Sequence, residues 1–166
     1  MRLVYKLLLI CKKAVGWITI FLLAWMVVLA LLQLLLRWTG LQGISWADIQ
    51  LRQLLLWLAL LGGVLAAAEN RHIRIDAIEH YLSGKMKFII QRLVSTIAAA
   101  CSGFLGYLSF SFIISEKNAD VMLDSLFFGT TTPIWIVELI IPISFWLMAL
   151  YLLVPVKEMP EQLKGN

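Results

Sequence analysis

The stretch AVGWITIFLLAWMVVLALLQLLL, residues 14–36, decides the class of this protein. It holds no charged side chain, and Gln33 is its strongly polar residue. A helix needs about 20 consecutive apolar residues to cross the hydrocarbon core of a bilayer. Residues 14–36 therefore predict a membrane-spanning helix.

Three more apolar stretches follow, and they predict further spans at about residues 46–68, 93–115 and 133–154. The second follows the pattern SWAD, residues 45–48, a capping box in which the serine and aspartate side chains can bond the first free N–H groups. Its helix is expected to begin at Trp46. The fourth span is expected to have Thr132 as its N-cap and Pro133 as its first helical residue.

The composition agrees with this class, since 61% of the 166 residues are hydrophobic and 14% are charged. Soluble domains have roughly 45–50% and about 25%. A chain this apolar has too few polar residues to cover a surface in water. The sequence therefore predicts an all-α integral membrane protein with four transmembrane helices in a single domain, residues 1–166.

Lysine and arginine residues predict the orientation of the chain. Eleven of the fourteen lie in the N-terminal segment, the loop between spans two and three, and the C-terminal tail, whereas the other two loops hold Arg37, Arg52 and Lys117. Short cytoplasmic loops carry the excess of positive charge, so both termini are expected in the cytoplasm. Amphipathic stretches before the first span and at residues 73–82 predict short helices lying on the inner membrane surface.

Glu138 is the ionisable residue inside a span where an ion or substrate path would first be sought. Pro142, four residues later, cannot donate a hydrogen bond to the Glu138 carbonyl, and a freed carbonyl beside a carboxyl group could bind a cation or a proton. Alternatively, Glu138 reaches the outer headgroups, pairs with Arg52, or pairs with another subunit. The residues leave both interpretations open.

The side chains present disfavour haem binding, disulfide exchange, zinc binding and nucleic-acid binding. His72 and His80 both fall in the middle loop, so no histidine pair can hold a haem across the bilayer. Cys11 and Cys101 form no motif of a disulfide oxidoreductase or a zinc site. Basic residues flank apolar stretches instead of forming a nucleic-acid-binding stripe. We therefore predict no enzyme activity, no catalytic residue, no metal, no cofactor and no nucleic acid.

Small residues at helical spacing occur in spans two and three, in the pairs Gly62/Ala66, Gly63/Ala67, Ala99/Gly103 and Ser102/Gly106. Such pairs allow close helix approach, either within this bundle or to another protein. A bundle that has no transport path of its own is most simply an accessory or scaffold subunit.

The stretch SWADIQLRQLLLWLALLGGVLAAAENRHIRIDAIEHYL, residues 45–82, resembles the DctQ-type small membrane subunit of TRAP (tripartite ATP-independent periplasmic) transporters. The residues that carry the resemblance, in order, are Trp46, Asp48, Arg52, Trp57, Gly62, Arg71, His72, Ile73 and Asp76. The fourth span is also similar to the last helix of that family, which begins at a proline and contains a second. Ile49 departs from the pattern, because many members have a second carboxylate there.

The resemblance implies a non-catalytic subunit of the bacterial inner membrane. It would form a static complex with a large DctM-type subunit, which moves substrate and sodium by an elevator movement. A soluble periplasmic binding protein would deliver the substrate, an organic acid such as a C4-dicarboxylate or sialic acid. The alternative is a self-contained four-helix proton-coupled exporter that uses Glu138.

Three groups of residues are the candidate contact sites. Packing against the partner subunit is expected at Trp57, Gly62, Gly63, Ala66 and Glu138. Contact with a cytoplasmic partner or lipid headgroups is expected at Arg71, His72 and Asp76, although these residues also suit a basic flank that only sets orientation. Docking of the binding protein is expected at Gln42, Asp48, Glu116, Lys117, Asp120 and Asp124, although these could also lie in solvated loops.

Overall fold

The computed structural model describes residues 2–40, 43–69, 84–120, 122–127 and 130–154. In chain order the elements are α1 (Arg2–Trp38), α2 (Ser45–Ala68), α4 (Gly84–Asn118), β1 (Met122–Phe127), β2 (Thr130–Pro133), α5 (Ile134–Glu138) and α6 (Ile140–Leu153). Within these described ranges, four helical segments are long and apolar enough to cross a membrane: Lys6–Trp38, Trp46–Ala68, Arg92–Asn118 and Ile134–Leu153. The predicted all-α membrane fold with four spans is confirmed.

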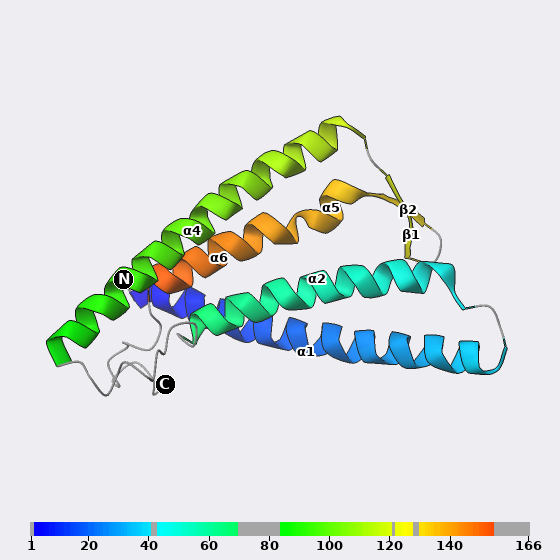
Figure 1. The fold of residues 1–166 in the computed structure, drawn as a ribbon, viewed down its shortest axis with the longest axis horizontal. Coiled ribbons are helices and arrows are strands. Elements are labelled where there is room, and N and C mark those ends of the chain that lie inside the picture. The colour runs from blue at the N-terminus through cyan, green and yellow to red at the C-terminus, as the bar shows by residue number, and fades with distance from the viewer. Residues whose placement is uncertain (1, 41–42, 70–83, 121, 128–129, 155–166) are drawn as a thin grey trace.

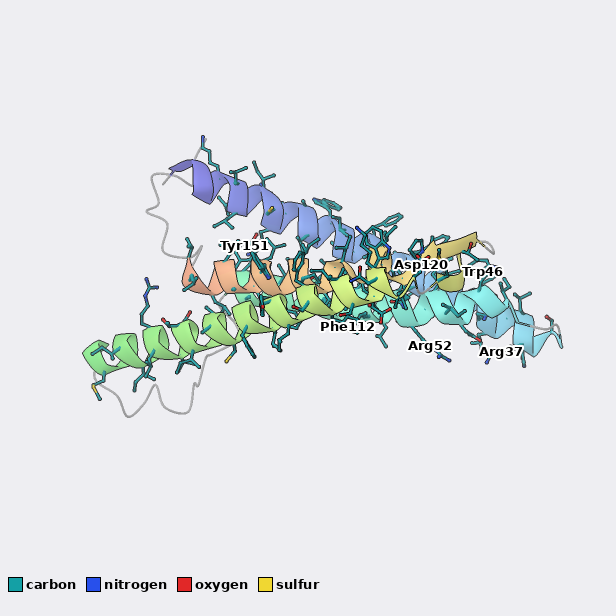
Figure 2. The ribbon with its side chains drawn as sticks, turned by 90° about the horizontal axis from the view of Figure 1, so that it is seen from above. Arg37, Trp46, Arg52, Phe112, Asp120 and Tyr151 are labelled. Carbon is teal, nitrogen blue, oxygen red and sulfur yellow. The ribbon has the colours of Figure 1, made fainter. Side chains whose placement is uncertain are left out.

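The helices form an open arrangement in which α6 lies between α4 and α2, and α1 runs along α2 (Figure 1). In the view of Figure 1 the helices lie closest together where α1 begins and α6 ends, which we call the terminal end, and α4 and α2 diverge toward the strands, at the hairpin end; in Figure 2, α1 and α4 separate at the terminal end. The buried core lies nearer the terminal end and includes Val64, Ala67, Ala99 and Tyr151. Apolar packing therefore holds one end of the bundle more tightly than the other.

Polar contacts add to this packing at the terminal end. The Tyr151 hydroxyl donates a hydrogen bond to the Leu8 carbonyl (2.9 Å), and the Ser95 hydroxyl donates to the Leu152 carbonyl (2.6 Å). Lys12 Nζ and Glu69 Oε1 form an ion pair at 3.5 Å. These contacts join α1 to α6, α4 to α6, and α1 to the residue that follows α2.

The N-terminal segment differs from its prediction. α1 is continuous from Arg2 to Trp38, so the basic residues before the first span belong to the spanning helix and not to a separate surface helix. The segment contains no proline, and its first glycine is Gly16, so nothing ends the helix before the apolar stretch. The other predicted surface helix, residues 73–82, lies outside the described residues.

The connection between spans three and four contains a β-hairpin that the sequence did not predict. β1 and β2 pair antiparallel, with Leu123 opposite Thr132 and an irregularity in register toward Phe127. Asp120 has a φ of 52°, a left-handed conformation that turns the chain away from α4. Because β1 also contacts α2, the hairpin bridges the diverging ends of α4 and α2 (Figure 1).

The fourth span is interrupted, and its start differs from the prediction. Thr132 belongs to β2, and Pro133 is the N-cap residue of α5, without a side-chain cap. Leu139 is a turn between α5 and α6. Pro142 has no N–H to offer the carbonyl of Glu138. The interruption, at Leu139, directly follows that carbonyl.

Candidate functional site

The turn between α1 and α2 is held by a polar network at the hairpin end. Gln33 is only 5% exposed, and its Nε2 donates to the Ile44 carbonyl (2.9 Å) and to Asp48 Oδ1 (3.0 Å). Gln33 Oε1 accepts a hydrogen bond from the Ile44 N–H (2.9 Å). Arg37 Nη2 donates to Asp48 Oδ2 at 3.0 Å, and this ion pair is exposed. One glutamine thus fixes the backbone of the turn.

This network corrects the predicted capping box. α2 begins at Ser45, and Ile44 occupies the N-cap position without a side-chain cap hydrogen bond. The Asp48 carboxylate instead accepts from Gln33 and Arg37 on α1. The local pattern SWAD could not reveal this, because the partners lie eleven and fifteen residues earlier in the chain.

The residues predicted to meet the binding protein lie toward the hairpin end, apart from Gln42, which lies outside the described residues. Glu116 and Lys117 belong to the last turn of α4, Asp120 follows it, and the backbone of Asp124 is part of β1. The Lys117 ammonium lies 5.4 Å from the centre of the Trp135 ring, which links α4 to α5. Docking at these residues stays a prediction.

The residues predicted to pack against a partner subunit separate into two groups. Trp57 Nε1 donates to the Val137 carbonyl on α5 at 3.1 Å, and a Cβ at Gly63 would overlap the terminal methyl of Met148 on α6. Both therefore make contacts within this chain. A Cβ at Gly62, by contrast, would meet no other atom within 4 Å, so Gly62 leaves open space beside α2.

α4 shows the same division. A Cβ at Gly106 would overlap the indole of Trp146 on α6, whereas a Cβ at Gly103 would meet nothing within 4 Å. One glycine of each helix therefore packs against α6 and the other does not. The small-residue pairs could be found in the sequence, but the face that each one occupies could not.

Glu138 does not form the suggested ion pair with Arg52. The ion pairs among the described residues are Lys12–Glu69 and Arg37–Asp48. Glu138 Oε2 is buried without a hydrogen-bond partner. The other buried oxygens without a partner in the described part of the chain are Gln50 Oε1, Gln53 Oε1, Thr132 Oγ1 and Ser144 Oγ.

These oxygens were not singled out from the sequence, although Gln50 and Gln53 stand three apart on one face of a predicted span. Buried polar groups are normally satisfied by protein or by ordered water. Within the described residues, no group of three histidine, cysteine, aspartate or glutamate side chains is placed to hold a metal ion. Arg71, His72 and Asp76 lie outside the described residues.

Large apolar side chains cover the outside of the bundle. Trp17 is 74% exposed and Phe21 is 69% exposed on α1, while Phe104, Tyr107 and Phe112 are exposed on α4. Figure 2 shows Phe112 on the outer side of its helix. Apolar surface of this extent needs lipid or another apolar protein surface to cover it.

The comparisons with known proteins agree with this architecture. The family model of the DctQ component of tripartite ATP-independent periplasmic transporters matches residues 15–159. A Haemophilus influenzae protein, whose name assigns it to the small permease proteins of TRAP transporters, is 33% identical over 90 residues. That match covers 54% of this chain and 56% of the relative, so it spans little more than half of the curated protein.

Small permease subunits of TRAP transporters work, as a general property of the family, with a large membrane subunit and a periplasmic binding protein. The four apolar helices and the family match assign the chain to the bacterial inner membrane as a multi-pass protein. The match extends over all four spans and most of the chain. The chain therefore belongs to the DctQ family of TRAP transporter subunits.

Proposed function

We propose that this chain is the non-transporting scaffold of a TRAP transporter, with both termini in the cytoplasm. It would hold a large DctM-type subunit that carries an organic acid together with sodium, after delivery by a periplasmic binding protein. The observation that carries the proposal is the DctQ family match over residues 15–159. The substrate class, C4-dicarboxylates or sialic acid, comes from the family alone.

The outward apolar faces of α1 and α4 support a scaffold role. A static subunit needs surfaces for lipid and for its partner, and it needs no ion path through its own helices. We also propose that it has no enzyme activity, because a scaffold of this kind performs its role through contact alone. Lipids would cover whatever apolar surface the large subunit leaves free.

Co-expression tests this proposal. The chain produced together with the large subunit is expected to purify as a stable complex of one copy each, whereas the chain alone should be poorly behaved in detergent, because its packing faces are uncovered. Proteoliposomes that contain the complex and the binding protein should take up substrate only with a sodium gradient. A stable homodimer that transports protons without the large subunit would contradict the proposal.

Glu138 distinguishes this proposal from the alternative, a proton-coupled exporter. The Oε2 atom of Glu138 is buried without a hydrogen-bond partner, and this observation favours the alternative. In a scaffold, Glu138→Gln keeps the size and most of the hydrogen-bonding capacity of the side chain. Sodium-driven uptake by the assembled complex is therefore expected to remain largely intact. An exporter that depended on a titrating carboxyl group would lose all transport. Complete loss of uptake by a variant that still assembles would assign this residue a direct part in coupling.

A further inference from the structure

Arg52, which was predicted among the basic residues of an outer loop, lies in the spanning helix α2, and no carboxylate of the described residues pairs with it. It lies seven residues after the start of α2, about 10 Å along the helix axis. Its side chain is exposed and projects from the bundle (Figure 2). Neither of the two ion pairs among the described residues includes it. An arginine in a spanning segment needs an anionic or hydrogen-bonding partner, because the hydrocarbon core cannot solvate it.

Asp48 would be the expected partner, since it lies one turn before Arg52 on the same helix. Both of its carboxylate oxygens are already engaged. Oδ1 accepts from Gln33 at 3.0 Å, and Oδ2 accepts from Arg37 at 3.0 Å. Asp48 is thus directed toward α1, and neither ion pair of the described residues includes Arg52, so we look for its counter-charge outside them.

Arg52 shares one face of α2 with residues that α6 does not cover. Residues 52, 55, 59, 62 and 66 follow the spacing of three and four that aligns side chains along a helix. Leu55 is 60% exposed, Ala59 is exposed, and Gly62 has open space beside it. The neighbouring residues Val64 and Ala67 are fully buried. We call residues 52, 55, 59, 62 and 66 the outward face of α2.

The outward face of α2 differs from the outward surface of α1. α1 exposes bulky side chains such as Trp17 and Phe21, which suit contact with lipid tails. The outward face of α2 becomes small in the second half of the helix, at Ala59, Gly62 and Ala66. Lipid tails gain nothing from small residues, whereas a second helix can approach closely there and pack against the backbone.

We propose that the outward face of α2 binds a transmembrane helix of the large subunit, and that this helix carries an aspartate or glutamate paired with Arg52. The inference rests on the proposed function and assigns it a contact surface. Arg52 and Gly62 are ten residues apart, about 15 Å along the axis. The partner helix should therefore carry its carboxylate roughly ten residues from the position that packs on Gly62.

The amount of large subunit that co-purifies with the affinity-tagged chain tests whether the outward face of α2 is the contact surface. Arg52→Gln and Gly62→Leu are each expected to lower recovery about tenfold, while Arg52→Lys retains most of it because the charge is kept. Ala30→Leu on exposed α1 and Gly103→Leu on α4 are matched controls, and both should assemble like the wild type. Because a Cβ at Gly62 meets no atom within 4 Å, Gly62→Leu alone should keep its helical circular dichroism.

Charge reversal tests the partner chemistry. Arg52→Glu should abolish recovery, and replacing one acidic residue in a helix of the large subunit by arginine should restore it. Each acidic residue in the outer half of those helices is changed in turn. If none restores recovery, the proposed carboxylate partner is wrong.

Three outcomes separate this inference from its alternatives. If Arg52 binds a phospholipid headgroup, Arg52→Gln will reduce the anionic lipid that co-purifies and leave recovery of the large subunit unchanged, which overturns the inference. If the wild-type complex forms while the Arg52 and Gly62 variants match the controls, this inference fails and the scaffold function stands. If the wild-type chain does not bind the large subunit, the proposed function itself fails.

Discussion

Gly106→Leu is expected to destabilise the folded bundle more than any other single substitution discussed here. A Cβ at this position would overlap Cδ1 and Nε1 of the Trp146 indole. The indole is large and rigid, so either its side chain must adopt another rotamer or α4 and α6 must separate. Overpacking of this kind costs about 1–3 kcal/mol or more. We expect a thermal midpoint lower by roughly 5–10 °C, measured by circular dichroism in detergent.

Gly103→Leu is the matched control, because it lies on the same helix and a Cβ there meets no atom within 4 Å. It should melt like the wild type. Gly63→Ala should have an intermediate effect, since the atom that its Cβ meets is the terminal methyl of the flexible Met148 side chain. Equal midpoints for Gly106→Leu and Gly103→Leu would show that α4 does not pack on α6 through this glycine.

Gln33→Leu is expected to have the second largest effect. Leucine matches the apolar surroundings of span one, yet it removes the bonds to both the N–H and the carbonyl of Ile44. Leaving buried backbone groups without partners costs about 1–3 kcal/mol each in soluble proteins, and measured interhelical hydrogen bonds in membranes average about 0.6 kcal/mol. We expect a loss of about 1–3 kcal/mol, measured by unfolding of the purified chain or of the complex.

Asp48→Asn provides the comparison for this prediction. Asparagine can still accept from Gln33, so the variant loses only the ion pair to Arg37. Both side chains of that pair are well exposed, at 62% and 47%, and such pairs contribute about 0–1 kcal/mol. The ranking fails if Asp48→Asn is as damaging as Gln33→Leu, because the charge and not the backbone contact would then hold the turn.

The spans could be predicted from the sequence because each depends on a local property, a run of apolar residues long enough for a bilayer. The hairpin could not, because its two short strands are held by pairing with each other and by contact with α2. The role of Asp48 also depends on α1. The prediction used only the local capping pattern, so it missed the bonds that Asp48 accepts from Gln33 and Arg37. Helical spacing identified Gly62 and Gly63 together, but only the packed structure shows that one faces Met148 and the other faces open space.

The same limit applies to the candidate contact residues. Glu138 was found because a charged side chain stands out in an apolar span, and Trp57 was found because it matches the family pattern. Their partners were not, since the bond from Trp57 to the Val137 carbonyl joins residues eighty positions apart. A residue of unusual type in a span can thus be identified from the sequence, whereas its hydrogen-bond partner on another helix is known only from the folded structure.

The divergence of the helices affects how the protein fits its bilayer. α4 and α2 spread apart toward the hairpin end in Figure 1, whereas α1 and α4 spread apart toward the terminal end in Figure 2, where the view is turned by 90°. The bundle is therefore elongated in a different direction in each leaflet. Lipids and neighbouring helices meet an outline that turns with depth, so a neighbour that follows one side of the protein across the bilayer must be tilted.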